Sequence, residues 1–487
     1  MSMKPVTNKR NVTIAVMIAT FLAAIEGTIV STAMPTIVSD LGGLHLISWV
    51  VSIYLLTSAV TTPIYGKLAD LYGRKIVFNV GASLFLIGSV LSGLSQTMEQ
   101  LIWFRAFQGM GAGAIITITY TIIGDIYPFE ERGKVQGWMS GIWGISGILG
   151  PLTGGLLVDY VSWHWIFYMN LPFGIVSIAL IGMYLHEQIE KKRKHIDYAG
   201  VATFTASMSA LLYALLSGGT EHPWDSPLII GLLVAAACGL ALFLYIEKKS
   251  PEPMLPLQLF SIRAISVANL AGFLLAAVLV AVSFYLPMWI QGVYGQGATG
   301  SGLTLIPMSI GWPLGAAWSG RLLARIGIRT TSLIGLIALI GATLWLALIS
   351  AETPHWMLFV ITFVVGFGFG FAFTSFTGAV LSVGWNLRGA AMATNTLIRT
   401  LGQTIGIALF GLMLNRSIQG IQGTESVDVN KILNPETARH FPPDVLQAAR
   451  EALAGGLHQI FVVLALLTVV SLVVTLAYPR QERQEAA

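Results

Sequence analysis

Long, uninterrupted runs of apolar residues recur along the whole chain. A helix needs about 20 such residues to cross the hydrocarbon core of a bilayer, and fourteen segments reach this length. They start near Val12, Ser48, Ile76, Glu99, Gly133, Trp163, Ile196, Pro227, Ala264, Thr299, Thr330, His355, Arg388 and Leu457. Barrel strands would alternate polar and apolar residues over about ten positions, and these runs do not. We therefore predict an all-α integral membrane protein.

The connections between the spans divide the chain into three parts. Most are short, but a basic run follows the sixth span and a charged, Pro-rich segment follows the eighth. We predict a six-helix bundle over residues 1–190, two additional transmembrane helices with their linker over 191–247, and a second six-helix bundle over 248–487. The second bundle includes a long outer loop, 415–456, in which residues 443–453 show helical spacing and predict a short amphipathic helix.

The placement of charge supports a membrane location. Apolar residues make up 55% of the chain and charged residues 10%, whereas soluble domains carry about 25% charged residues. With the N-terminus in the cytoplasm, 21 of the 27 Lys and Arg fall on the cytoplasmic side, two lie inside spans and four fall in the outer loop. Cytoplasmic loops are enriched in basic residues, so we predict an even number of spans and two cytoplasmic termini. The basic net charge then reflects topology, and we expect no nucleic-acid partner.

Composition and spacing argue against several kinds of chemistry. The single cysteine, Cys238, allows no disulfide within the chain. The sequence has no Walker loop, no zinc-type histidine cluster and no nucleophile elbow. We therefore expect no metal site, no cofactor and no enzymatic activity, and ATP-driven pumping is disfavoured.

Of the 23 acidic residues, Glu26 alone lies well inside an apolar span. A charge near the bilayer centre costs roughly 3 kcal/mol on insertion scales, so such a group is normally paired or functional. At about 1.5 Å per residue, Glu26 lies about 21 Å from the inner start of the first span and Arg105 about 9 Å from the outer start of the fourth. In a core of about 30 Å these depths coincide. The estimate allows an ion pair, direct or through water, in which Glu26 is either a fixed structural partner or a proton carrier.

Arg399 is the other cation inside a span. It lies about 16 Å into the eleventh span of the two bundles at about 1.5 Å per residue, and no acidic residue of the second half shares its depth. It bonds either backbone carbonyls and polar side chains such as Gln403, or an anionic group of a substrate.

Aromatic side chains within the spans are candidates for contact with substrate, because aromatic rings bind lipophilic cations through cation–π contacts. These candidates are Tyr54, Trp143, Phe284, Trp289, Phe369 and Phe373. Each is alternatively a packing or lipid-facing residue. Together with Glu26 and Arg399 they form the predicted substrate-binding set.

A short polar segment separates the second and third spans. Residues 66–75 read Gly-Lys-Leu-Ala-Asp-Leu-Tyr-Gly-Arg-Lys, and residues 320–329, at the matching place of the second half, read Gly-Arg-Leu-Leu-Ala-Arg-Ile-Gly-Ile-Arg. Glycine permits a tight turn, and a carboxylate such as Asp70 can cap a helix N-terminus. The first segment resembles motif A of the major facilitator superfamily. It matches that motif at Gly66, Leu68, Asp70, Gly73, Arg74 and Lys75.

The resemblance implies a role for this turn. In that superfamily the turn is a cytoplasmic latch between the two halves, and Arg74 would pair with Asp125 at the cytoplasmic end of the fourth span. Residues 104–109, Phe-Arg-Ala-Phe-Gln-Gly, resemble motif B. That resemblance links Arg105 to proton transfer and, with Glu26, to proton coupling.

The fifth span carries a glycine stripe and ends with Gly-Pro-Leu-Thr-Gly-Gly at residues 150–155. Glycines on one face permit close helix contact, and proline removes a backbone hydrogen bond and kinks a helix. The span resembles motif C, which marks the antiporter branches of the superfamily. The positions assigned to this motif are Gly141, Gly150, Pro151, Gly154 and Gly155.

Residues 26–35, Glu-Gly-Thr-Ile-Val-Ser-Thr-Ala-Met-Pro, resemble the signature of fourteen-span drug:proton antiporters, with Glu for Asp and Ser for Asn. The resemblance covers nearly the whole chain and implies the major facilitator fold, two six-helix bundles plus two extra central helices. It implies export of small lipophilic, often cationic compounds by alternating access. The proton gradient would drive this export, with no obligatory protein partner, across the plasma membrane of a bacterium.

Two alternatives stay open. Export of a natural lipid, siderophore or peptide-like substrate would use the same mechanism. A membrane receptor or enzyme is the alternative from another class, and the absence of the catalytic motifs above disfavours it.

Overall fold

The computed structural model describes residues 7–187, 197–219, 221–250, 253, 255–382, 388–419 and 433–479. Within these ranges the regular structure is helical, apart from one isolated bridge between Gly218 and His222. The prediction of an all-α protein is confirmed for this part of the chain. The chain divides into two compact units, the first comprising Met1–Ala214 and Ile230–Met254 and the second Leu215–Ile229 and Leu255–Ala487.

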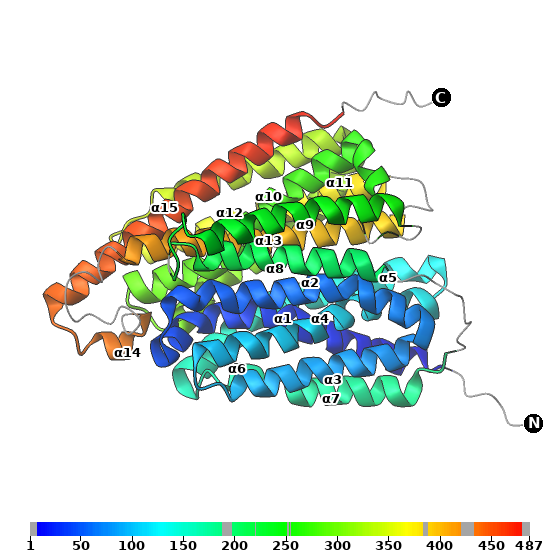
Figure 1. The fold of residues 1–487 in the computed structure, drawn as a ribbon, viewed down its shortest axis with the longest axis horizontal. Helices are drawn as coiled ribbons and strands as arrows, with labels where there is room; N and C mark the ends of the chain where they lie inside the picture. Colours follow the sequence, from blue (N-terminus) through cyan, green and yellow to red (C-terminus); the bar gives the residue numbers. More distant parts are fainter. Residues whose placement is uncertain are drawn as a thin grey trace, which may run out of the picture. The chain divides into compact units, whose positions relative to one another are not determined.

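The first unit contains the helices coloured blue to green in Figure 1. They are α1 (Lys9–Leu41), the 3-10 helix η1 (Leu44–Leu46), α2 (Ile47–Tyr72), α3 (Arg74–Gly93), α4 (Met98–Ile126), α5 (Phe129–Tyr160), α6 (Trp165–Tyr168), α7 (Asn170–Tyr184) and most of α8 (Tyr198–Ser217) and α9 (Pro227–Lys249). Helix α4 packs against α1, α2 and α3, and α1 also packs against α5 and α7. Helices α1, α3, α4 and α7 therefore share one interior.

The second unit is built mainly from five long helices. Its elements are η2 (Leu257–Ser261), α10 (Arg263–Met288), the π-helical turn η3 (Trp289–Val293), α11 (Ala298–Ala347), α12 (His355–Leu381), α13 (Arg388–Gln419), α14 (Pro435–Ala438) and α15 (Pro443–Leu476). Helix α12 packs along α11, and α10 packs against both α13 and α15.

Thirteen helices of the described residues are long and apolar enough to cross a membrane. The prediction of fourteen spans is met only if α11 is counted as two, since Gly327 leaves the helical region inside it, with φ 76° and ψ 169°. The predicted short helix at 443–453 is wrong as a separate element, because α15 runs without a break from Pro443 to Leu476. The basic run at 191–194, on which the first predicted domain boundary depends, lies outside the described residues.

The internal sequence repeat is also present in the backbone. Gly73 and Gly327 occupy the same place in segments 66–75 and 320–329. Both have positive φ, 92° at Gly73 and 76° at Gly327. This region of φ is costly for residues with a Cβ, so glycine permits the turn between α2 and α3 and the turn within α11.

Small residues allow neighbouring helices to approach closely in both units. An added Cβ at Gly88 of α3 would lie 2.5 Å from the Gln108 nitrogen and 2.6 Å from its Cα on α4. In the second unit, an added Cβ at Gly366 or Gly370 of α12 would overlap the backbone of α11 at Met308 or Trp312. Without a hydrophobic drive between helices in lipid, such contacts are a main source of helix association.

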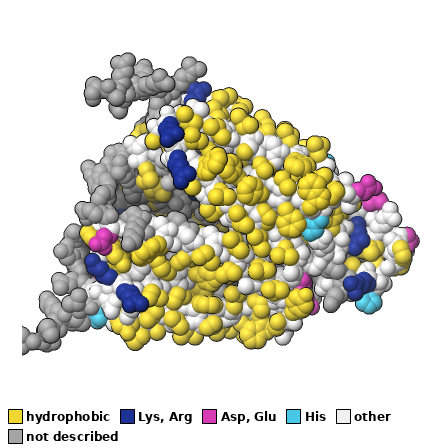
Figure 2. Space-filling model, turned by 180° about the vertical axis from the view of Figure 1, so that it is seen from behind, with side chains coloured by type: hydrophobic (Ala, Val, Ile, Leu, Met, Phe, Trp, Pro, Cys, Tyr) yellow, Lys and Arg dark blue, Asp and Glu magenta, His cyan; other side chains and the backbone are white. Residues whose placement is uncertain are grey.

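The exposed surface is strongly apolar. Hydrophobic side chains cover most of the face seen in Figure 2. Large apolar residues with more than half of their surface exposed include Ile76, Val80, Ile87, Trp103, Trp318, Ile337 and Val473. Exposed apolar area on this scale is a liability in water and is expected against lipid chains.

We predict that Gly88→Ala destabilises the protein, because the new methyl group would overlap the backbone of α4 at Gln108. Overpacking of this kind costs about 1–3 kcal/mol. The measurement is thermal unfolding of the purified protein in detergent. Gly124→Ala is the matched control, since nothing lies within 4 Å of an added Cβ there. Equal midpoints for the two variants would show that α3 and α4 can separate at no cost.

Candidate functional site

A buried ion pair lies at the centre of the first unit. Glu26 of α1 is 0% exposed and Arg105 of α4 is 2% exposed. Arg105 Nη1 donates directly to Glu26 Oε1. The depth estimate from the sequence allowed this contact, and the structure shows it to be direct.

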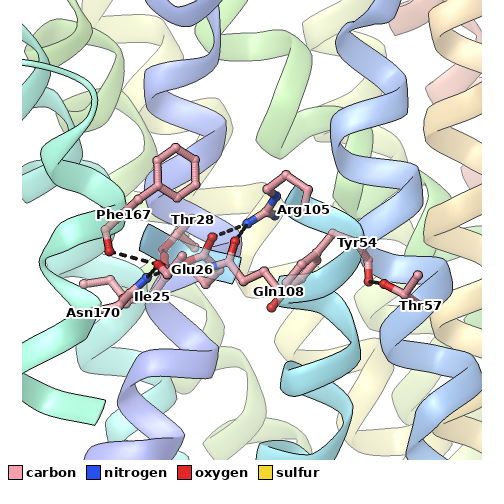
Figure 3. A network of polar contacts seen from close by, with 10 residues as sticks. Ile25, Glu26, Thr28, Tyr54, Thr57, Arg105, Gln108, Phe167 and Asn170 are labelled. Atoms are coloured by element: carbon pink, nitrogen blue, oxygen red, sulfur yellow. Dashed lines mark hydrogen bonds and ion pairs between the residues drawn. The ribbon is translucent and has the colours of Figure 1, made fainter. Parts of the chain in front are cut away.

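Three further polar side chains close a ring of hydrogen bonds around this pair. Asn170 Nδ2 donates to Glu26 Oε2 at 2.9 Å and to Ser89 Oγ at 2.8 Å. Gln108 Oε1 accepts from Arg105 Nη1 at 2.7 Å, and Gln108 Nε2 donates to Ser89 Oγ at 3.3 Å. The ring thus runs through Glu26, Arg105, Gln108, Ser89 and Asn170, and Figure 3 shows Glu26 between Arg105 and Asn170. We call these five residues the Glu26 ring.

Ser89 anchors the Glu26 ring to the backbone. Its hydroxyl donates to the Phe167 carbonyl oxygen at 2.9 Å while its oxygen accepts from Gln108 and Asn170. A serine hydroxyl has one donor and two acceptor positions, so all three are used. Ser89, Gln108, Asn170 and Glu26 are each fully buried. These buried hydrogen bonds join α1, α3, α4 and α7 to one another.

The side chain of Tyr54 and helix α5 pack next to the Glu26 ring. The guanidinium carbon of Arg105 lies 4.0 Å from the centroid of Tyr54, which is 8% exposed. A cation over an aromatic face is stabilised by about 0.5–2 kcal/mol. On α5, an added Cβ at Gly154 would lie 2.9 Å from Ile29 Cγ1, and one at Gly150 would overlap Thr28. These two glycines let α5 pack directly on α1 around Glu26.

The remaining motif C positions have different surroundings. Pro151 lies inside α5 between the two glycines that contact α1. Gly155 is buried. Nothing lies within 4 Å of an added Cβ at Gly141, so this glycine makes no comparable close contact.

The arrangement of Glu26 couples its protonation to its contacts. Oε1 accepts from Arg105 and Oε2 accepts from Asn170. A proton on either oxygen would add a donor there, weaken that oxygen as an acceptor and remove the negative charge that balances Arg105. Asn170 Oδ1 and Arg105 Nε are buried and have no hydrogen-bond partner among the described residues. The charge state of Glu26 thus bears directly on the contacts of the Glu26 ring.

The predicted pair between Arg74 and Asp125 is present in the turn between α2 and α3. Arg74 Nε lies 2.8 Å from Asp125 Oδ2 on α4, and Arg74 Nη2 lies 3.3 Å from Asp70 Oδ1. Gly66 lies one helical turn before Asp70 on α2, with Thr117 Cγ2 3.7 Å from an added Cβ. The role of this turn as a latch stays a prediction.

The helix cap in this turn differs from the one expected. Asp70 belongs to the last turn of α2 and binds Arg74. Glu187, beyond the end of α7, caps α3 instead, with Oε2 accepting from the Arg74 nitrogen at 2.9 Å and Oε1 from the Lys75 nitrogen at 2.8 Å. A carboxylate at a helix N-terminus satisfies free N–H groups and the helix dipole.

The candidate aromatic residues separate into different environments. Trp143 on α5 is 42% exposed, whereas Phe284, Trp289, Phe369 and Phe373 are all at most 4% exposed. Trp289 packs against Phe461 at 5.7 Å and Phe284 against Tyr285 at 6.2 Å. These two are packing residues of the second unit.

Phe369 and Phe373 belong to a separate stack. They stack on each other at 5.6 Å, and both stack on Trp312 of α11, at 5.8 Å and 5.5 Å. The guanidinium carbon of Arg399 lies 3.8 Å from the Phe373 ring centroid. Trp312, which sequence reasoning missed, joins this group.

Four residues that form hydrogen bonds around the predicted site residues were not predicted from the sequence: Asn170, Ser89, Gln108 and Glu187. Gln108 stands in the motif B segment beside Arg105, and Asn170 is the only asparagine between Asn79 and Asn269. A buried amide in an apolar span is itself a signal of hydrogen bonding. Ser89 and Glu187 carry no such signal, because serines are common in spans and Glu187 stands in a charged loop.

The family of this chain follows from its similarity to known proteins. The Major Facilitator Superfamily profile matches residues 16–199 and 191–407. The chain belongs to this superfamily. It is therefore a multi-pass membrane protein of a transporter family.

Its relatives include two proteins of Bacillus subtilis (strain 168). Multidrug resistance protein 3 is 35% identical over 488 residues, which cover 97% of this chain and 95% of the relative. Multidrug transporter protein MdtP is 36% identical over 417 residues, covering 85% of this chain and 77% of the relative.

Solved structures show the same fold at low sequence identity. A bacterial homolog of the human lysosomal transporter Spinster, in an inward-facing and unoccupied conformation, aligns with a TM-score of 0.69 at 17% identity and covers 97% of this chain and 98% of its own. A D-xylose-proton symporter aligns with a TM-score of 0.61 at 12% identity, covering 94% and 97%. These likenesses establish the fold of this transporter.

We predict that Asn170 and Ser89 are energetically coupled in this transporter. Asn170→Leu removes donors to both Glu26 and Ser89, and leaving buried polar groups unsatisfied costs about 1–3 kcal/mol. The measurement is thermal unfolding of Asn170→Leu, Ser89→Ala and the double variant. Residues in one network show coupling energies of about 0.5–3 kcal/mol. Strict additivity of the two changes would contradict the Glu26 ring.

We predict that Glu187→Ala destabilises the start of α3, because the Arg74 and Lys75 nitrogens lose their acceptor. Loss of an N-terminal cap costs about 0.5–2 kcal/mol. Hydrogen exchange of the first turn of α3 would report the change. The control is Glu99→Ala, an exposed acid in the first turn of α4, and unchanged exchange in Glu187→Ala would rule the cap out.

Proposed function

We propose that this chain exports lipophilic compounds, often cationic, in exchange for protons, with Glu26 as the proton-coupling residue. The observation that carries the proposal is the Glu26 carboxylate, 0% exposed inside a span and held by both Arg105 and Asn170. A structural ion pair needs no titration, but an acid whose two oxygens each hold a different helix can convert a proton into a change of helix packing. The two Bacillus relatives, a multidrug resistance protein and a multidrug transporter, support multidrug transport as the activity.

The mechanism follows from the contacts of the carboxylate. While Glu26 is ionised, its charge balances Arg105 and ties α1 to α4. A proton arriving on Glu26 cancels the carboxylate charge, so Arg105 loses its counter-ion. The hydrogen bond to the protonated oxygen, from Asn170 at Oε2 or from Arg105 at Oε1, is weakened. Alternating access requires two packings of the same helices, and protonation selects between them. Loss of the proton restores the ring and resets the cycle.

Charge also supports export of cations by this mechanism. A lipophilic cation beside Glu26 competes with Arg105 for the carboxylate, and a proton on Glu26 removes the attraction for both. Proton binding then weakens the hold on the substrate, as exchange requires. The proposal needs no cofactor, no metal and no protein partner, since the proton gradient supplies the energy.

The test uses the full chain in proteoliposomes with a cationic dye. We expect the wild-type protein to release protons when the dye is added and to move the dye against its gradient, and Glu26→Gln to do neither. Glutamine keeps the size and hydrogen-bonding capacity of the side chain but cannot exchange a proton at neutral pH. Glu99→Gln, an exposed acid at the start of α4, is the control for loss of one carboxylate.

The outcomes separate the parts of the proposal. Proton-coupled dye movement by Glu26→Gln at the wild-type rate would show that the proton route uses another residue. Dye movement without proton release in the wild type would refute antiport. If the wild type moves no dye, multidrug export itself is wrong.

A further inference from the structure

The second unit contains a cation deep in a span that has no counter-ion among the described residues. Arg399 of α13 is partly exposed, and its one partner in the part of the chain described is the ring of Phe373, 3.8 Å from the guanidinium carbon. Arg105 in the first unit, by contrast, is matched by the carboxylate of Glu26. A guanidinium has five N–H donors, and a ring face replaces none of their hydrogen bonds to oxygen.

A second donor without a partner in the described part of the chain is the side-chain amide of Asn269, which binds Asn395 near Arg399. Asn395, one helical turn earlier on α13, donates through Nδ2 to Asn269 Oδ1 of α10 at 2.8 Å. Asn269 is 1% exposed, and its own Nδ2 has no hydrogen-bond partner among the described residues. Reversing both amide groups would exchange the roles of the two residues and leave the Asn395 nitrogen unused instead. Either assignment leaves one amide NH2 group without a partner in this part of the chain.

Gly272 of α10 lies next to both Arg399 and Asn395. It lies one turn after Asn269 on α10, and an ideal Cβ there would be 3.7 Å from Arg399 Cγ and 4.0 Å from Asn395 Nδ2. Helices α10 and α13 therefore approach closely beside the arginine stem. The stem of Arg399 and the amide nitrogen of Asn395 thus lie beside the same point of α10.

An apolar wall completes the site. Phe373 and Phe369 are nearly parallel, with an interplanar angle of 14°, and Trp312 stacks on both at 22° and 28°. Arg399 lies against the end of this stack at Phe373. Phe369 and Phe373 are buried and Trp312 is only half-buried, so Trp312 is the ring of this group that a ligand can reach. A ligand with a flat apolar body and one oxyanion would match this aromatic group next to a guanidinium.

We propose that Arg399, with Asn269 and Asn395, forms a subsite for the oxyanion of an amphipathic substrate. Carboxylate, sulfonate and phosphate groups share the geometry that a guanidinium binds through two parallel hydrogen bonds. The inference rests on the proposed function in taking the ligand as the exported compound. It adds that the exported class includes acids and zwitterions, in which an anionic group neutralises Arg399.

The test compares two dyes that differ at one group. Rhodamine B carries a flat cationic ring system and a free carboxylate, and its ethyl ester carries the same ring system with the carboxylate masked. Equilibrium binding of each dye to the purified full chain is measured by fluorescence polarisation, with no proton gradient. We expect Arg399→Gln to weaken binding of the acid about tenfold, the size of a lost hydrogen bond to a charged group, and to leave binding of the ester within twofold.

Two variants and one control sharpen this result. Arg399→Lys keeps the charge without the paired donors and should lie between wild type and Arg399→Gln. Asn269→Leu keeps the arginine and should weaken binding of the acid alone, which keeps the test usable if Arg399→Gln does not fold. Arg321→Gln removes an exposed cation of the same unit and should change neither dye.

Equal weakening of both dyes by Arg399→Gln, or no change in either, would overturn the subsite. A lipid head group is the other source of an oxyanion, so bound phospholipid is quantified in the purified wild type and in Arg399→Gln. One phospholipid per chain lost in Arg399→Gln, with no preference for the acid dye, would overturn the assignment to substrate. Because binding is measured without a gradient, failure of dye export in vesicles would count against the proposed function and not against the subsite.

Discussion

The ion pair between Glu26 and Arg105 is the contact on which the first unit depends. Removing both charges from water costs several kcal/mol per ion, and attraction offsets this only where further hydrogen bonds satisfy the remaining donors and acceptors. Asn170, Gln108 and Ser89 supply those bonds. The close approach of α3 to α4 at Gly88 and of α5 to α1 at Gly154 brings the helices near enough for the bonds to form. The small residues therefore permit the close helix contacts that the buried hydrogen bonds require.

Much of this arrangement could be predicted from the sequence, and the limit has a physical cause. Span positions follow from hydropathy, and the depth of a charge follows from the helical rise, so the meeting of Glu26 and Arg105 was within reach. Asn170 binds Glu26 across 144 positions of sequence. That contact depends on the rotation of α7 about its own axis, which length and composition do not set. Glu187 replaced Asp70 as the cap of α3 for the same reason, since its approach depends on how α7 ends.

The two units use the arginines within their spans in opposite ways. Arg105 is neutralised within the protein, so the charge of its surroundings changes only when Glu26 gains or loses a proton. Arg399 has an aromatic face as its partner among the described residues, so its charge is left for something from outside to balance. A proton site needs an internal acid whose partner is fixed, whereas a recognition site needs a donor whose partner is missing. Sequence hydropathy treats both arginines alike, and the contacts distinguish them.

Gly73 and Gly327, two of the six glycines with positive φ among the described residues, make the tolerance of this chain to mutation uneven. Gly73 and Gly327 stand in turns whose neighbouring residues differ between the two halves, yet both backbones have the same unusual conformation. Every amino-acid substitution at these glycines introduces a Cβ into a backbone conformation that costs roughly 1–3 kcal/mol for other residues. Many exposed lipid-facing positions, by contrast, accept one apolar residue for another. Variation among descendants of this gene should therefore be sparse at these two points and frequent along the outer faces of the helices.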